Sequence, residues 1–274
     1  MPFVKLEESP LARRRAEIHY REFGSGKPLL FLHSGWGYHI YPINKQLHEL
    51  KEYRVLIPDR SGYGLSTKPA AFGVDFHMRA AEETFAFMDA LGIGEAVLWG
   101  HSDGSVIAAW MGLMHPERCQ GLVLEAFHYS RRKVKSLEFF KEMVSAPEKF
   151  GERVAAVLAH EHGESYWREL LRSSGQTWLE IASSADCAGE DLFNGRFGEM
   201  RVPTVLLHGA GDPRTDEGEL AAVQSTLPSA EIRMIESGGH CPHNESRSAV
   251  EFTQELMHAL ARFQIGCCTS PGAI

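Results

Sequence analysis

A serine between two glycines marks the point in this chain where nucleophilic chemistry is expected. Residues 100–104 read Gly-His-Ser-Asp-Gly, after an apolar run at 96–99 and before a helix-like run at 106–114. A serine on a sharp turn from strand to helix projects from the backbone, and the flanking glycines give the turn room. The helix start also directs N–H groups toward developing negative charge. The pattern therefore predicts that Ser102 attacks a carbonyl carbon.

A serine hydroxyl needs a base, and the base needs a carboxylate that orients it. Residues 204–208 read as a buried strand that runs toward Asp212, and residues 232–235 read as a strand that precedes His240. Groups that follow parallel strands gather at the carboxyl edge of a sheet. The sequence therefore predicts a catalytic triad of Ser102, Asp212 and His240.

Two neighbouring residues offer alternatives. Asp216 is the second candidate for the acid. Asp212 could instead cap the helix that is expected to begin near Asp216. We prefer Asp212 because it lies closer to the end of its strand. His243 is expected either at the surface or in support of the site from behind.

A tetrahedral intermediate also needs donors for its oxygen. The apolar run 28–32 ends in a loop, residues 33–37, that reads His-Ser-Gly-Trp-Gly. We assign one donor to the backbone N–H of Gly35 and the other to the N–H of Asp103, the residue after the nucleophile. Loss of one such donor typically costs on the order of 3–4 kcal/mol in the transition state.

These motifs resemble the α/β-hydrolase superfamily in its single-domain, lidded form. The similarity covers residues 16–263, and its motifs include the 33–35 loop and the run 59–66, Asp-Arg-Ser-Gly-Tyr-Gly-Leu-Ser. Ser34 and Ser61 stand where the family usually has glycine. The resemblance implies an α/β fold with a mostly parallel, eight-stranded sheet flanked by helices and interrupted by a helical lid. Relatives that dehalogenate alkanes or open epoxides use aspartate as nucleophile, so a serine implies acyl transfer.

The pattern of elements agrees with that organisation. Strand-like and helix-like runs alternate, which favours a mostly parallel sheet. Strand-like runs vanish between 128 and 200, so we assign the hydrolase core to 1–127 and 201–265 and the lid to 128–200. The tail 266–274 is expected to be disordered. The expected strands lie at 16–23, 28–32, 53–58, 96–99, 121–124, 204–208 and 232–235, and the expected helices at 76–91, 106–114 and 245–263.

Five side chains are expected to line the substrate pocket because they lie near the predicted loops or in the lid. They are Ser34, Trp36, Phe127, Trp167 and Trp178. The basic run 131–133 is expected to be a solvated helix start.

Composition restricts the function classes. The net charge of −8 argues against nucleic acid and anionic membrane partners. No run approaches the ~20 apolar residues that span a bilayer, and the polar N-terminus lacks the apolar core of a signal peptide. The five cysteines are odd in number and show no metal-binding spacing. We therefore expect a cytoplasmic enzyme with a small-molecule substrate, no metal and no cofactor, and the sequence leaves its oligomeric state open.

The substrate class is less constrained. We expect hydrolysis of a small carboxylic ester, lactone or thioester. The Gly-x-Ser-Asp-Gly turn is also similar to that of the biphenyl-hydrolase-like group, which includes valacyclovir hydrolase, and this likeness implies that Asp103 holds a substrate ammonium group.

Two alternatives to ester hydrolysis stay open. The first is carbon–carbon bond hydrolysis of a ring-cleavage dienoate, which needs a lid residue such as Arg168, Arg172 or Asn194 to bind a carboxylate. The second is a non-catalytic member of the fold that binds a ligand.

Overall fold

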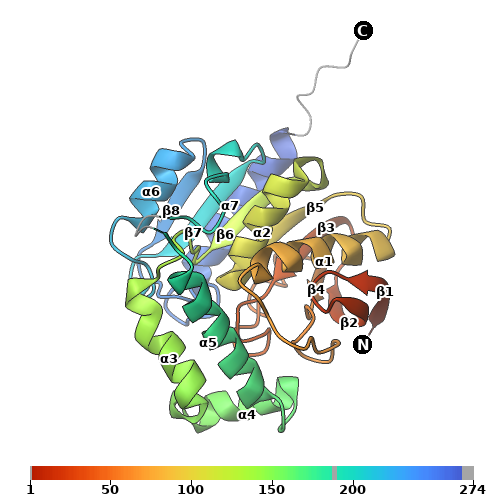
Figure 1. Ribbon diagram of the computed structural model, residues 1–274. Helices are drawn as coiled ribbons and strands as arrows, with labels where there is room; N and C mark the ends of the chain where they lie inside the picture. The colour runs from red at the N-terminus through yellow and green to blue at the C-terminus, as the bar shows by residue number, and fades with distance from the viewer. Residues whose placement is uncertain (1, 187–189, 267–274) are drawn as a thin grey trace.

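An eight-stranded sheet organises the protein, as the computed structural model of residues 2–186 and 190–266 shows (Figure 1). The strand order is β1-β2-β4-β3-β5-β6-β7-β8. β1 pairs with β2, and β2 with β4, in antiparallel fashion, whereas all the other pairings are parallel. The strands are β1 (Phe3–Ser9), β2 (Arg14–Phe23), β3 (Lys27–Leu32), β4 (Tyr53–Pro58), β5 (Ala96–His101), β6 (Cys119–Glu125), β7 (Thr204–Gly209) and β8 (Glu231–Ile235). The predicted mostly parallel sheet is confirmed.

The first strand differs from the prediction. β1 lies at the edge of the sheet and exposes most of its side chains. Val4 and Leu6 alternate toward the core, but Glu8, the next residue of that face, is charged and exposed. The apolar alternation is therefore too short to indicate a strand. The predicted opening strand at 16–23 corresponds to β2, the next strand in the sheet.

Helices cover both faces of the sheet. The α-helices are α1 (Phe76–Ala90), α2 (Asp103–Met114), α3 (Leu137–Ser145), α4 (Glu152–His162), α5 (Trp167–Ser183), α6 (Glu219–Thr226) and α7 (Ala249–Gly266). Successive strand residues point to opposite faces. Leu30 and Leu98 therefore join the core that contains α1 and α2, whereas Phe31 and Trp99 join the core under α7.

The segment between β6 and β7 forms a helical insertion, residues 128–200, that contains α3, α4 and α5. Figure 1 shows α3 and α5 side by side, with α4 across their far end. Short 3₁₀ helices at Val134–Ser136, Pro147–Phe150 and Phe197–Glu199 complete the segment. Strands are absent from this part of the chain, apart from the single bridge between Ser130 and Asp191, as far as its described residues extend.

The end of α4 is attached to the core by two buried side chains. The Glu161 carboxylate accepts the N–H groups of Tyr38 (2.7 Å) and His39 (2.9 Å), which follow β3. His162 accepts the Gly64 N–H at Nδ1 (2.9 Å) and contacts the Trp36 carbonyl through Nε2 (3.0 Å). A ring that accepts at one nitrogen and donates at the other is neutral.

One surface expectation is wrong. The run 131–133 was expected to be solvated, but Lys133 is completely buried and forms an ion pair with Glu219. The same carboxylate accepts the N–H groups of Tyr129 (2.9 Å) and Ser130 (3.1 Å). A buried lysine needs such a partner because desolvation of an unpaired charge is costly. Lys133 therefore helps to hold the chain that leaves β6.

Other expectations concern the ends of the chain and its cysteines. Within 2–186 and 190–266, no helix combines the length and the apolar character needed to cross a bilayer. Cys119 and Cys241 are buried and free. Cys187, Cys267, Cys268 and the predicted disordered tail after Gly266 lie outside the described residues.

The neutral state of His162 gives a prediction for stability. Burial lowers the pKa of this ring from 6.5 to about 4. Between these values only the unfolded chain takes up a proton at this site, so the free energy of unfolding falls as the pH is lowered, by up to about 1.4 kcal/mol per pH unit. His162→Gln, which can still accept and donate, should reduce the loss of stability in urea unfolding between pH 6.5 and pH 5. An unchanged pH dependence would contradict the assignment.

Candidate active site

Ser102 occupies a strained turn between β5 and α2. Its φ of 55° lies in the left-handed region, which is unfavourable for a residue with a side chain. A Cβ atom at Gly100 would lie 2.1 Å from the carbonyl oxygen of Gly104, and one at Gly104 would lie 1.9 Å from that of Leu32. Only glycine fits at both positions. The two glycines of the serine turn are therefore required by close backbone contacts.

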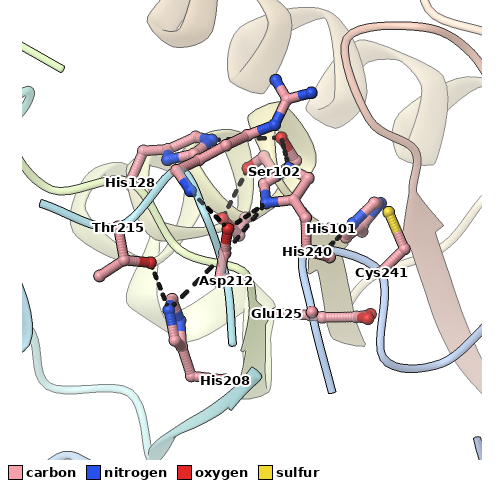
Figure 2. Close-up of polar contacts among 12 residues, drawn as sticks. His101, Ser102, Glu125, His128, His208, Asp212, Thr215, His240 and Cys241 are labelled. Carbon is pink, nitrogen blue, oxygen red and sulfur yellow. Dashed lines mark hydrogen bonds and ion pairs between the residues drawn. The ribbon is translucent and has the colours of Figure 1, made fainter. Parts of the chain in front are cut away.

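The structure brings Ser102, His240 and Asp212 into one hydrogen-bonded chain (Figure 2). Ser102 Oγ lies 3.1 Å from His240 Nε2, and His240 Nδ1 lies 3.0 Å from both carboxylate oxygens of Asp212. The three residues follow β5, β8 and β7, whose carboxyl ends share one edge of the sheet. A parallel sheet thus converts three distant segments into one site.

The Asp212 carboxylate is held as an anion. Burial by itself raises its pKa, but the hydrogen bond and charge of His240 and the Arg214 N–H (2.9 Å) hold this pKa well below its usual value. Asp216, the alternative acid, instead accepts the N–H groups of Val134 (2.9 Å) and Lys135 (2.8 Å). Asp212 is therefore the carboxylate that orients His240.

His240 is arranged as a neutral base. Burial and the nearby Arg214 charge lower its pKa, while Asp212 opposes the shift. A neutral ring with its proton on Nδ1, toward Asp212, leaves Nε2 free to accept the proton of Ser102.

A second histidine contacts the serine and was missing from the predicted site. His128 Nε2 lies 3.2 Å from Ser102 Oγ, and its ring stacks on that of His240 with 5.6 Å between centroids. Both contacts can form because a hydroxyl has one donor and two acceptor sites. Burial, followed by the charge of Lys133, lowers the pKa of His128 well below its usual value. The sequence signal for His128 was its position shortly after the strand β6. Asp212 was predicted from the same kind of position, after β7.

The loop after β3 lies beside the serine turn. Among the described residues, the N–H groups of Gly35 and Asp103 donate to no carbonyl or side chain, and both residues line the cavity at Ser102. Arg60 fixes this loop by donating to the carbonyl oxygens of His33 (2.7 Å) and Ser34 (2.8 Å). The Ser34 hydroxyl accepts the Trp36 N–H (3.3 Å) and is thus engaged within the loop.

The Asp103 side chain is buried next to Ser102. Its Oδ1 accepts the indole N–H of Trp178 (3.0 Å) and lies 3.4 Å from His77 Nε2, and its Oδ2 lies 3.9 Å from Arg60. Burial raises its pKa, but these partners, His77 first, more than offset that effect and lower it. Oδ2 has no hydrogen-bond donor within the described part of the chain.

The cavity around Ser102 has a free volume of about 30 Å³. Of the predicted pocket residues, Ser34, Trp36 and Trp178 line it. Phe127 does not, because it is packed between Phe193 and Phe197 at ring distances of 5.7 and 5.3 Å. Residues missed by the sequence prediction also line the cavity, including Tyr41, His128, Phe139, Phe140, Ser174 and Arg214.

Other predicted contacts also lie elsewhere. Trp167 is buried outside the cavity, and its ring lies under the guanidinium group of Arg168 at 4.3 Å. Arg168 pairs with Glu148 (2.9 Å) and Asn194 accepts from Arg131, while Arg172 is exposed. None of the lid residues considered for a carboxylate lines the cavity.

A buried cluster supports the site from behind. His101, Glu125 and His243 present ligand-type atoms within 4.8 Å of one another. His243 Nδ1 lies 2.6 Å from Glu125 Oε1 and its Nε2 lies 2.9 Å from the Tyr41 carbonyl, while His101 Nε2 lies 3.0 Å from the His240 carbonyl. These nitrogens therefore contact Glu125 and the backbone of the loops around the site. Of the two alternatives for His243, the structure favours support from behind.

Comparison with known proteins adds independent information. The family model described as alpha/beta hydrolase fold matches residues 27–189. The chain is 28% identical to a non-heme haloperoxidase of Rhodococcus erythropolis over 77% of this chain and 82% of that one. It is 29% identical to haloalkane dehalogenase 2 of Mycobacterium tuberculosis over 48% of this chain and 46% of that one. The enol-lactonase from Burkholderia xenovorans has a similar fold, with a TM-score of 0.65, 18% identity, and coverage of 90% and 97%.

The serine turn gives a prediction about stability. Gly104→Ala should lower the free energy of unfolding by at least the ~1–3 kcal/mol typical of overpacking, because the new methyl group meets the backbone of β3. Gly94→Ala is the matched control, since a Cβ there meets nothing within 4 Å. Urea unfolding of both variants measures the effect. Equal stability of the two variants would contradict the tight contact.

Proposed function

Because the chain belongs to the alpha/beta hydrolase fold family, we propose that it hydrolyses a small carboxylic ester, lactone or thioester through an acyl-enzyme on Ser102. The observation that carries the proposal is the continuous hydrogen-bonded chain from Ser102 through His240 to Asp212. A serine with such a chain is suited to acyl transfer.

The reaction follows from the contacts of these three side chains. Ser102 Oγ attacks the substrate carbonyl carbon while its proton passes to His240 Nε2, 3.1 Å away. Asp212 stabilises the imidazolium that forms, and His240 then protonates the leaving oxygen or sulfur. Water attacks the acyl-serine with His240 as base and releases the acid and free Ser102. The N–H groups of Gly35 and Asp103 are proposed to stabilise the intermediate oxygen.

The helical insertion is proposed to act as a lid. A cavity of about 30 Å³ holds roughly one water molecule, whereas ligand pockets usually occupy ~300–1,000 Å³. Substrate entry therefore requires movement of the walls, and α3 and α5 contribute Phe139, Phe140 and Trp178 to them. Closure over a bound substrate would exclude bulk water.

The residue at the nucleophile position distinguishes this chain from two kinds of relative that its sequence matches. One of them is a haloalkane dehalogenase and another is an epoxide hydrolase. The family resemblance implies an aspartate nucleophile for those two reactions, and this chain has Ser102. We therefore favour acyl transfer over both reactions.

Turnover of a panel of chromogenic esters tests the proposal. Wild-type protein should hydrolyse at least one 4-nitrophenyl ester of short, medium or long acyl chain, and Ser102→Ala should lose that turnover by a factor on the order of 10³ or more while it unfolds at the same urea concentration. Turnover retained by Ser102→Ala would refute the mechanism. Tight ligand binding without any turnover would support the non-catalytic alternative, and turnover of a dienoate alone would support carbon–carbon hydrolysis.

A second pair of variants tests the choice of acid. Asp212→Asn should lower kcat by a factor on the order of 10⁴, because the amide favours the wrong tautomer of the base histidine. Asp216→Asn should have little effect on kcat, since Asp216 caps the chain at Val134 and Lys135. The measurement is kcat on the best ester from the panel. The reverse order of effects would assign the role to Asp216.

A further inference from the structure

Arg214 brings a positive charge to the wall of the candidate active site. It follows Asp212 by two residues, and its N–H is bonded to the Asp212 carboxylate at 2.9 Å. Its side chain lines the same cavity as Ser102 and His240. The guanidinium carbon lies 3.5 Å from the centroid of the Phe139 ring, which in turn stacks on Trp36. Backbone and aromatic contacts therefore hold this side chain against the cavity.

The guanidinium group of Arg214 lacks a polar partner among the residues that the structure describes. Across 2–186 and 190–266, no carboxylate lies within 4.0 Å of it and no oxygen accepts a hydrogen bond from it. The other arginines near the core differ. Arg60 donates to two carbonyl oxygens, and Arg21 pairs with Asp59 at 2.6 Å. A partly buried charge without a partner is costly, so the fold leaves the five donors of Arg214 available to something else.

The two carboxylates near the cavity have partners other than the Arg214 guanidinium, although Oδ2 of Asp103 accepts no hydrogen bond from the described residues. Asp212 is bonded to His240, and Asp103 is bonded to Trp178 with Arg60 at 3.9 Å. Burial lowers the pKa of Arg214, while the negative charges of Asp212 and Asp103 oppose this shift. Arg214 is therefore the arginine at this end of the cavity whose guanidinium contacts no carboxylate and no carbonyl oxygen of the described residues.

We propose that Arg214 binds a carboxylate group of the substrate, so that the preferred substrates are esters or lactones that carry a second, ionised carboxyl group. A planar guanidinium presents paired N–H donors that match a carboxylate. The face of Phe139 occupies one side of the guanidinium and leaves its edge for the ligand. This inference rests on the proposed function and assigns a substrate class to the same site.

The position of Arg214 in the chain also suits a role in orienting the substrate toward His240. The lid arginines expected to bind a carboxylate lie outside the cavity, whereas Arg214 comes from the loop after β7 that carries Asp212. A substrate carboxylate held there would be fixed relative to Asp212, which lies two residues before Arg214 and is hydrogen-bonded to His240. Arg214 would thus select the substrate and orient it in one contact.

A matched pair of esters tests the inference. The probes are 4-nitrophenyl hydrogen glutarate, which is anionic, and 4-nitrophenyl hexanoate, which is neutral and of similar length. Spontaneous hydrolysis is measured with Ser102→Ala and subtracted. The readout is the ratio of kcat/KM for the anionic ester to that for the neutral ester. Any general effect of Arg214 on the pKa of His240 acts on both esters and cancels in this ratio.

Three variants give the expected pattern. Arg214→Met should lower the ratio by about 10- to 100-fold, the range expected for loss of charge-assisted hydrogen bonds. Arg214→Lys should lower it less, because it keeps the charge and loses the paired donors. Arg153→Met removes the same charge from an exposed position on α4 and should leave the ratio at the wild-type value. An equal ratio in wild type and Arg214→Met would overturn the inference.

Binding separates this inference from the proposed function. Calorimetric titration of Ser102→Ala with glutarate should show binding that weakens by at least about tenfold when Arg214→Met is added. If glutarate binds in this way and no ester is hydrolysed, the proposed function fails and the anion site stands. If esters are hydrolysed and glutarate binding does not depend on Arg214, the inference fails and the proposed function stands.

Discussion

The contact between the first turn of α2 and the end of β3 is the constraint on which the site depends. A methyl group at Gly104 would lie 1.9 Å from the Leu32 carbonyl, so the helix start and the strand end touch through their backbones. This approach carries Ser102 to the loop that contains Gly35. Ser102, in the same turn, has a φ of 55°, a strain of roughly 1–3 kcal/mol that the surrounding sheet and helix must offset.

Buried charges then fix the loops around that contact. Arg60 holds the carbonyl oxygens of the loop after β3, Glu161 holds the N–H groups further along the same loop, and Glu219 holds those of the chain after β6. Each group satisfies backbone atoms that no strand or helix can pair, which is the usual condition for a buried charge to be tolerated. Lys133 neutralises Glu219 in turn. Arg214 departs from this rule, because its guanidinium has no polar partner among the described residues and its side chain lines the cavity beside Ser102.

The helical insertion completes the site and nearly closes it. Phe139 and Trp178, from α3 and α5, contribute to walls around a free volume of about 30 Å³. The insertion is attached through Glu161 and His162 to the same loop that supplies Gly35. A movement of the insertion would therefore be transmitted to the loop of Gly35, one of the two proposed oxyanion donors, as well as to the substrate entrance. The neutral state of His162 makes that attachment dependent on pH.

The sequence by itself determined the sheet, the order of its motifs and the residues 102, 212 and 240, because strand periodicity and the glycines around Ser102 are local signals. It missed β1, whose apolar alternation is limited to Val4 and Leu6. It also misjudged Phe127, Trp167 and Lys133, because which neighbour a side chain meets depends on packing between segments far apart in the chain. Only the tertiary structure decided that His128 reaches Ser102, that Asp216 caps a turn, and that the Arg214 guanidinium has no polar partner within the described part of the chain. These are properties of distances between elements, which no local pattern encodes.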